Sequence, residues 1–498
     1  MDLSSGHRLL TLGTLYTISK GLSSSIGIIL IPVYSHFLGK AGYGVISLMI
    51  PVTFLLAYIF LQGLQGAWVR LRFDQETGLD LRKFESSIFW YVSLSSIIGL
   101  IILWFTGPFI SKHIFSEIEF YPIVFLTTCH SAFIIYSILI EEKLQAEHHP
   151  GKLIAFNIFR FILIVGFILF FVVVLDRGVI GKIEADVISS GILAILVIIT
   201  LKPLPPKYVS VGVLKKSLAY GLPLLPHNIL GLLNDILDRF IVSILLGITE
   251  TGIYAMGYNI AAVIRIFILS LTRAYTPVFI KAVKNHQKEH DKGNHEKAND
   301  IIAKAIRGGL LIVAVSSCIA LALNSVSREL LMIVATKDFE QSWRIIPPVT
   351  VGITAMACYA VFVQPVFFHT RHVRLVSFMT GCAVIVNIVF NIILIPITGI
   401  MGAALATLIS NLLLVFIAIV ISQKIMPLPH KWKNWILMGC SFTAGMSVLW
   451  IIDVSMQNIL ARLLLKMVFS ILSIIIVAWS AGFRLREIFE LARRLHKS

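Results

Sequence analysis

Apolar residues occur along the chain in long runs, which short polar connections separate. A helix that crosses the hydrocarbon needs about 20 apolar residues, whereas a barrel strand needs only about 10 in alternation with polar ones. The pattern predicts an all-α polytopic membrane protein with about 14 transmembrane helices, of which 179–201 and 433–453 are the weakest. The predicted spans are 10–37, 43–66, 86–108, 120–141, 153–175, 179–201, 218–247, 252–278, 300–324, 344–368, 374–396, 400–424, 433–453 and 459–482.

The connections between these spans are too short to hold a soluble domain. The longest is the polar run from Lys281 to Asn299, which we expect to be a solvated loop. It contains His286, His290 and His295, but no cysteine or well-placed carboxylate completes a metal site, so no metal is predicted. The first apolar run contains Lys20 and lacks a small-residue cleavage site, so it is interpreted as a retained span.

Composition supports the same class of protein. Hydrophobic residues make up 57% of the 498 positions and charged residues 14%, whereas about 25% are charged in soluble domains. Too little polar surface remains to cover a soluble core, and the chain is too apolar to be disordered. The five cysteines all lie in apolar spans without a disulfide or metal-binding spacing.

Lysine and arginine residues predict the orientation in the membrane. With the N-terminus in the cytoplasm, 28 of the 42 fall in inside segments, nine in outside segments and five within spans. This asymmetry predicts that both termini are cytoplasmic. Basic loops beside an anionic leaflet account for most of the +16 net charge, so no nucleic-acid partner is predicted. The nine outside cations are Lys40, Lys112, Arg177, Lys182, Arg328, Lys337, Arg344, Arg462 and Lys466.

Glycines recur at fixed offsets in the two halves of the chain. At an offset of 208, the repeat pairs Gly13 with Gly221, Leu38 with Leu246, Gly39 with Gly247, and Gly44 with Gly252. At an offset of 221, it pairs Gly178 with Gly399 and Gly181 with Gly402. Ungapped glycine matches at two places predict a duplication into parallel six-helix repeats, with a substrate site between them. The predicted divisions are a lobe over 1–207, a lobe over 208–428, and two further helices with a basic tail over 429–498.

Several stretches resemble the polysaccharide-exporter branch (Wzx-type flippases) of the multidrug/oligosaccharidyl-lipid/polysaccharide (MOP) exporter superfamily. They are FLGKAGYGVISL, GITETGIYAMGYNIAAVI, the pair Asp238-Arg239 and GIMGAALATLIS. The resemblance implies two six-helix lobes in a V shape that alternate access to a central cavity. The two C-terminal helices resemble a pair that borders a lipid-tail groove in the lipid II flippases of this superfamily.

The resemblance also implies a function. The cargo would be an undecaprenyl-pyrophosphate-linked oligosaccharide, such as an O-antigen, exopolysaccharide or capsule repeat unit, which crosses the bacterial inner membrane. Implied partners are the lipid-linked substrate, the bilayer, a glycan polymerase and export machinery. No cofactor and no catalytic residue is predicted, and coupling to an H⁺ or Na⁺ gradient is left open.

Four cations inside spans are candidates to bind the pyrophosphate headgroup. Arg265 lies near the middle of its span and is the best of them, because a guanidinium keeps its charge and can hold a phosphate bidentately. Its alternative is an ion pair with an acid on another helix. Lys20, whose repeat partner is Asn228, and Arg160 either line the cavity or extend to the headgroups. Arg273 lies near the inner end of its span, where anchoring is the stronger interpretation.

The fifth cation within a span, Arg239, lies among acids. Asp235 precedes it by four residues, so the two can pair along one helix face. The alternative is that Asp235 or Asp238 binds a proton or Na⁺ that drives transport.

Two other functions compete with the flippase. A cation-coupled multidrug exporter of the same superfamily would need a carboxylate in the N-terminal lobe, where the first span offers Lys20 and no acid. A membrane-embedded glycan polymerase or acyltransferase would need catalytic groups in a large outside loop. The outside connection 325–344 shows no nucleophile–base arrangement, so an enzyme is not predicted.

Overall fold

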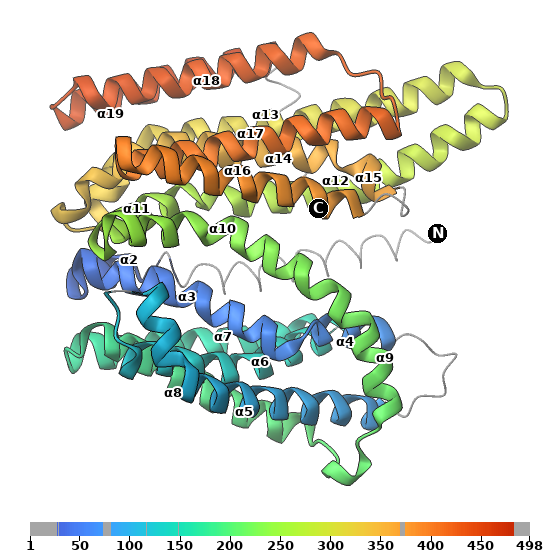
Figure 1. Ribbon diagram of the computed structural model, residues 1–498. Helices are drawn as coiled ribbons and strands as arrows, with labels where there is room; N and C mark the ends of the chain where they lie inside the picture. Colours follow the sequence, from blue (N-terminus) through green and yellow to red (C-terminus); the bar gives the residue numbers. More distant parts are fainter. Residues whose placement is uncertain are drawn as a thin grey trace. The chain divides into compact units, whose positions relative to one another are not determined.

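The structure of the protein, a computed structural model, describes residues 27, 29–72, 81–115, 117–147, 149–368 and 374–482. The side chains of Arg72, His227, Asn234 and Asp235 are outside this description. The described residues are helical and include no strand (Figure 1). They pack into two compact units, Met1–Gly252 and Ile253–Ser498.

The first unit contains nine labelled helices and the start of a tenth among its described residues. They are α2 (Ile31–Phe37), α3 (Gly39–Leu61), α4 (Leu64–Arg72), α5 (Leu81–Ile114), α6 (Phe125–Ala146), α7 (Pro150–Ile168), α8 (Gly178–Leu201), α9 (Val211–Gly221) and α10 (Leu225–Leu246). The next helix, α11 (Ile248–Ala261), crosses the division between the units. Helix α10 lies in the predicted second lobe, yet it packs on α3 within this first unit.

The second unit continues with longer helices in its described part. They are α12 (Val263–Asp291), α13 (His295–Val334), α14 (Ile346–Phe362), α15 (Gln364–Phe368), α16 (Arg374–Thr398), α17 (Ile400–Ile425), α18 (Trp432–Ser455) and α19 (Ile459–Ser480). The last two form an antiparallel pair, and α19 packs along α13.

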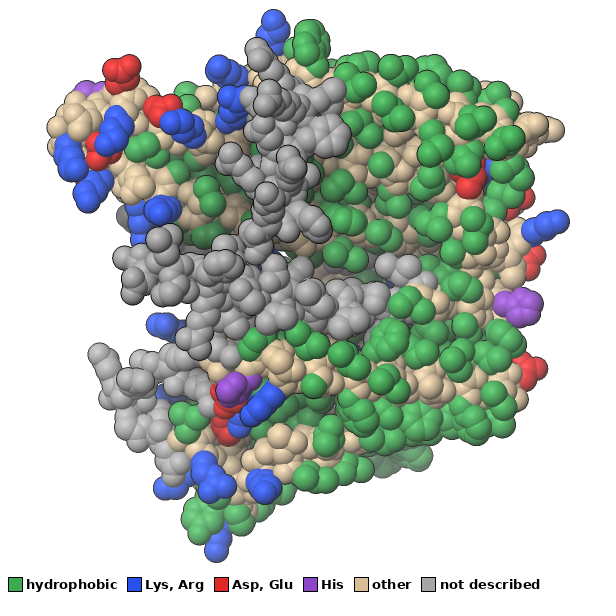
Figure 2. Space-filling model, turned by 180° about the vertical axis from the view of Figure 1, so that it is seen from behind, with side chains coloured by type: hydrophobic (Ala, Val, Ile, Leu, Met, Phe, Trp, Pro, Cys, Tyr) green, Lys and Arg blue, Asp and Glu red, His purple; other side chains and the backbone are tan. Residues whose placement is uncertain are grey.

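The predicted class, an all-α polytopic membrane protein, is confirmed. Twelve helical stretches in the described residues are long and apolar enough to cross a membrane. They include both weakly predicted spans, as α8 and α18. The seventh predicted span forms α10. This helix is not among the twelve, because it contains three charged residues, Asp235, Asp238 and Arg239. The first predicted span lies largely outside the described residues. Figure 2 shows hydrophobic side chains spread over much of the face in view.

The polar run Lys281–Asn299 is not the loop that we expected. Helix α12 continues to Asp291 and α13 begins at His295, so only a short turn with Gly293 at φ +79° separates them. A narrow buried seam of Val283, Ala298 and Ile302 joins the two helices. Ala298 and Ile302 are four residues apart and share one face of α13, but charged residues dominate the sequence around them. The result is a basic helical hairpin (Figures 1 and 2).

The backbone reproduces the duplication that the glycines predict. Gly39 and Gly247 both have positive φ, at +63° and +90°. Gly178 and Gly399 likewise have φ of +55° and +63°. Such backbone is unstrained for glycine and costly for other residues. Matching positions of the two repeats therefore turn the chain in the same way.

Helices α3 and α11 cross in backbone contact at one matched glycine pair. A Cβ on Gly44 would lie 2.1 Å from the carbonyl oxygen of Ile248, and a Cβ on Gly252 would lie 2.0 Å from that of Lys40. The two contacts are reciprocal, because Lys40 and Ile248 are themselves 208 residues apart. Glycine is thus required on both sides of this crossing.

We expect Gly44→Ala or Gly252→Ala to destabilise the folded protein by about 1–3 kcal/mol, because the added methyl must push two backbones apart. Gly231→Ala in α10 is the matched control, since a Cβ there meets nothing within 4 Å. Thermal melting of the purified protein in detergent measures the difference. Equal melting temperatures for Gly44→Ala and Gly231→Ala would contradict the close crossing.

His430, in the connection between α17 and α18, lies in an aromatic cluster. Its ring centroid is 4.9 Å from that of Phe362 and 5.8 Å from that of Trp435. Neither ring nitrogen has a hydrogen-bond partner among the described residues. Burial disfavours the charged imidazolium and lowers the pKa of His430 to about 4.

A lowered histidine pKa makes stability depend on pH in a known direction. The unfolded chain takes up a proton near pH 6.5, whereas folded His430 does so only near pH 4, so stability falls as the pH drops between these values. We expect His430→Phe to flatten this part of the pH profile of the melting temperature. His290→Phe, at an exposed position, should leave the profile unchanged. A profile that His430→Phe does not alter would show that the histidine stays solvated.

Candidate functional site

Arg265 lies where α11 gives way to α12. The α11 helix ends at Ala261, and the Arg265 N–H returns to the carbonyl of Ala262 at 2.9 Å. The side chain is half-buried, and its Nη2 donates to the Tyr258 hydroxyl at 3.0 Å. Tyr258 packs on Tyr254 in turn, with ring centroids 5.9 Å apart. A neutral phenol therefore orients a guanidinium that retains its full charge.

Arg160 on α7 is paired with an acid that the sequence reasoning missed. Its Nη1 donates to Glu141 Oε1 on α6 at 2.9 Å, and the two side chains are 17% and 22% exposed. This ion pair neutralises both groups and joins two adjacent helices. Nothing in local spacing links positions 141 and 160, which belong to different helices. The geometry thus adds a structural role to the two roles weighed for Arg160.

Asp238 and Arg239 lie near the middle of α10, where it packs on α3. Asp238 is buried, and its Oδ1 accepts the backbone N–H of Arg239 at 2.8 Å. Arg239 Nη1 donates to the Ser47 carbonyl of α3 at 3.5 Å. The described contacts therefore connect α10 to α3. The predicted Asp235–Arg239 pair involves a side chain outside the described residues and stays a prediction.

Two candidates remain, Lys20 and Arg273. Lys20 lies outside the described residues. Arg273, eight positions after Arg265 on α12, has an exposed side chain, as an anchoring residue would. Within the described residues, no group of three or more His, Cys, Asp or Glu side chains could hold a metal ion.

Lys182, which the charge pattern assigns to an outside segment, lies near the start of α8. It is only 4% exposed and forms an ion pair with Asp186 one turn later. His130 Nδ1 on α6 lies 3.9 Å from Asp186 Oδ2. The spacing of four between a lysine and an aspartate was the signal that could have found this pair.

Arg328, Arg462 and Lys466, also assigned to outside segments, lie near the end of α13 and in the first half of α19. Arg462 and Lys466 are almost fully buried. Their partners are Glu329 on α13 and Asp453 on α18. These two cations are therefore neutralised by acids on neighbouring helices.

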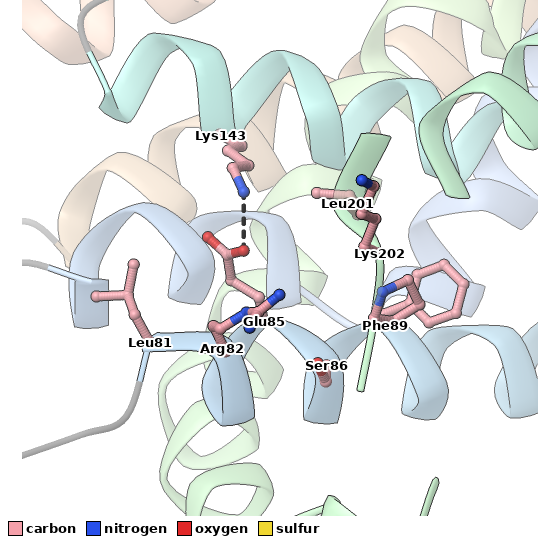
Figure 3. A pocket seen from close by; sticks show the side chains of 9 residues that line it. Leu81, Arg82, Glu85, Ser86, Phe89, Lys143, Leu201 and Lys202 are labelled. Atoms are coloured by element: carbon pink, nitrogen blue, oxygen red, sulfur yellow. Dashed lines mark hydrogen bonds and ion pairs between the residues drawn. The ribbon is translucent and has the colours of Figure 1, made fainter. Parts of the chain in front are cut away.

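A basic pocket lies at the predicted cytoplasmic end of the first unit (Figure 3). It has a volume of about 240 Å³ and is lined by Arg82, Lys143 and Lys202, together with Glu85 and apolar groups of α5 and α8. Lys143 Nζ points at the Glu85 carboxylate, 2.8 Å away. Cations in such a position attract anionic headgroups toward the protein.

An apolar groove lies between α14, α17 and α18 in the second unit. Its volume is about 420 Å³, and its walls include Pro347, Val351, Leu405, Met446 and Trp450. Most of its lining cannot hydrogen-bond, so the groove suits a hydrocarbon chain.

Known proteins resemble this chain in sequence and in fold. A family described as polysaccharide biosynthesis protein matches residues 10–283, more than half of the chain. A protein of the Lsg locus of Haemophilus influenzae is 27% identical over 288 residues, which are 54% of this chain and 65% of that protein. The match thus spans slightly less than two thirds of that relative.

Two solved structures share the fold at low sequence identity. The lipid II flippase MurJ, in an inward closed conformation, has a TM-score of 0.69 at 17% identity over 93% of this chain and 98% of its own. An inward-facing multidrug resistance MATE transporter of the MOP superfamily has a TM-score of 0.63 at 14% identity over 80% and 94%.

The chain therefore has the fold that this lipid II flippase and this MOP superfamily transporter share. The chain belongs to the polysaccharide biosynthesis protein family, whose match covers more than half of its residues.

We expect Glu141→Gln to destabilise the protein by about 1–3 kcal/mol, because it leaves the half-buried Arg160 guanidinium uncompensated. The double variant Glu141→Gln/Arg160→Gln should recover most of this loss. Glu184→Gln is the control, since its partner Arg177 is 48% exposed and such pairs contribute little. A double-mutant cycle on melting temperatures measures the coupling. Equal losses for the two single acid variants would argue that Arg160 is solvated.

Proposed function

We propose that the protein moves an undecaprenyl-pyrophosphate-linked oligosaccharide across the bacterial inner membrane by alternating access, with both termini in the cytoplasm. Membership of the polysaccharide biosynthesis protein family and the MOP fold support a lipid-linked glycan as cargo. The observation that carries the proposal is Arg265, a cation within a predicted span that a phenol orients at a helix break.

A pyrophosphate headgroup needs permanent cations when it leaves water. The Arg265 guanidinium has five N–H donors, so it can hold Tyr258 and a phosphoryl oxygen at the same time. Contact with phosphate is frequently bidentate, which fixes the position of the headgroup as well as its charge. Lys20, Arg160 and Arg273 are the other proposed headgroup ligands.

The lipid part of such a cargo requires a separate, apolar environment. The groove of α14, α17 and α18 offers about 420 Å³ of apolar space, which fits a segment of a prenyl chain. The basic pocket of Arg82, Lys143 and Lys202 would raise the local concentration of anionic headgroups at the cytoplasmic surface. We propose that headgroup and tail are handled at different places, as expected for a substrate with one charged and one apolar end.

A cation-coupled multidrug exporter is the second candidate. It would bind an organic cation with a buried carboxylate, and Asp238 is such a group. Two other acids of the first unit argue against it, because Glu141 and Asp186 are already paired with Arg160 and Lys182. Coupling of transport to H⁺ or Na⁺ through Asp235 or Asp238 is compatible with either function.

The test is complementation of a host that lacks this gene, with membrane insertion of each variant verified. We expect Arg265→Ala to reduce surface glycan by at least about tenfold, since a lost charged hydrogen bond is worth about 1.5–3 kcal/mol. The intact lipid-linked oligosaccharide should accumulate. Arg265→Lys should recover part of the transport, because lysine keeps the charge but lacks the bidentate fork.

Lys288→Ala is the matched control, because it removes an exposed cation from the same helix. Normal glycan with Arg265→Ala would eliminate Arg265 as the headgroup ligand. Resistance to cationic dyes on overexpression, with unchanged glycan, would favour the multidrug exporter.

A further inference from the structure

Four buried ionised side chains meet where three helices of the second unit come together. Glu329 lies on α13, Asp453 near the end of α18, and Arg462 and Lys466 on α19. Lys466 is 0% exposed, Arg462 2% and Asp453 3%. We call these four residues the ion quartet.

Each base of the quartet contacts both acids. Glu329 accepts from Arg462 Nε at 2.8 Å through Oε1 and from Lys466 Nζ at 2.6 Å through Oε2. Asp453 Oδ1 lies 3.0 Å from Lys466 Nζ and 3.6 Å from Arg462 Nε. Two negative and two positive charges close a ring with no net charge. Pairing of opposite charges is what makes buried ions tolerable.

Backbone contacts extend the quartet to the turn between α18 and α19. Arg462 Nη1 donates to the Met456 carbonyl at 3.3 Å, and Arg328 donates to the carbonyl of Asp453. Arg328 also packs over the Trp343 ring at 4.5 Å and lies 3.5 Å from Glu340. The turn is therefore held from α13 and from the segment that follows it.

The charges are divided between helices in an unusual way. The α19 sequence Ile459–Ser480 contains two cations and no acid. An uncompensated cation in a membrane helix is costly, so α19 gains stability from acids on the neighbouring helices. Arg462 and Lys466 are four residues apart and thus share one face, which meets Glu329. The same face continues through Ser470 and Ser473.

Away from the quartet, helices α18 and α19 pack closely against each other. A Cβ on Gly445 of α18 would lie 2.8 Å from the Ser473 hydroxyl oxygen of α19. Small residues allow such close approach but supply little selectivity for one partner. The quartet supplies that selectivity, because only a surface with the matching acids can receive this face of α19.

We infer that the ion quartet is the docking site by which the C-terminal helix pair α18–α19 is fixed to α13. Its partner is this chain's own α19, the last helix of the described residues. Arg462 and Lys466 are therefore committed to helix docking and do not serve as ligands for an anionic substrate or as an ion-coupling site. This inference does not depend on the identity of the transported substrate.

The test uses the full chain, purified in detergent and followed by thermal melting and by hydrogen exchange. Glu329→Gln and Lys466→Met each leave an uncompensated buried charge. We expect each to lower the melting temperature and to speed exchange of the α18 and α19 amides on the order of tenfold, with the amides of α3 to α8 unchanged. The double variant Glu329→Gln/Lys466→Met retains the Asp453–Arg462 contact and should recover most of both losses.

Asp338→Asn is the matched control, since it removes an exposed acid from the segment that follows α13. Single variants that melt and exchange like the control would overturn the inference. A double variant no better than the worse single one would also overturn it, because charge balance would then not be what matters. Loss of transport with unchanged melting and exchange would instead make the quartet a functional ion site. None of the stability readouts requires the substrate, so they stand even if the proposed cargo is wrong.

Discussion

An ionised side chain in the middle of a bilayer costs about 2.5–3.5 kcal/mol on insertion scales. The protein consists of apolar helices, and this cost determines where charged side chains occur among them. Charges are accepted where they meet a partner on a neighbouring helix. Arg160 meets Glu141, Lys182 meets Asp186, and the four residues of the ion quartet satisfy one another. Charged pairs thus specify which apolar helix lies beside which.

Arg265 differs from these pairs in the contact that orients it. Its described hydrogen bond goes to the neutral hydroxyl of Tyr258, so this contact leaves the positive charge in place. A guanidinium has five N–H donors, so one that contacts a phenol can contact an anionic headgroup at the same time.

The sequence was sufficient to predict the helices and the duplication. A run of about 20 apolar residues predicts a span by itself, because its length matches the thickness of the hydrocarbon core. Matched glycines such as Gly39 and Gly247 predict turns, because glycine adopts positive φ without strain, and both residues have positive φ. Both signals are local. The partners of the charges are not, because Glu329 and Arg462 are 133 residues apart in the chain. The hairpin of α12 and α13 was missed because its few buried residues stand among many exposed charges in the sequence.

The same hairpin offers a place where a probe outside the bilayer can be attached to the second unit. Two continuous helices of 29 and 40 residues carry any displacement of their apolar parts to the short turn at Gly293. A rigid marker protein inserted in that turn would move with both helices and not with a flexible loop. The turn is therefore a natural attachment point for a fiducial in electron microscopy or for a fluorophore that reports motion of this unit during a transport cycle.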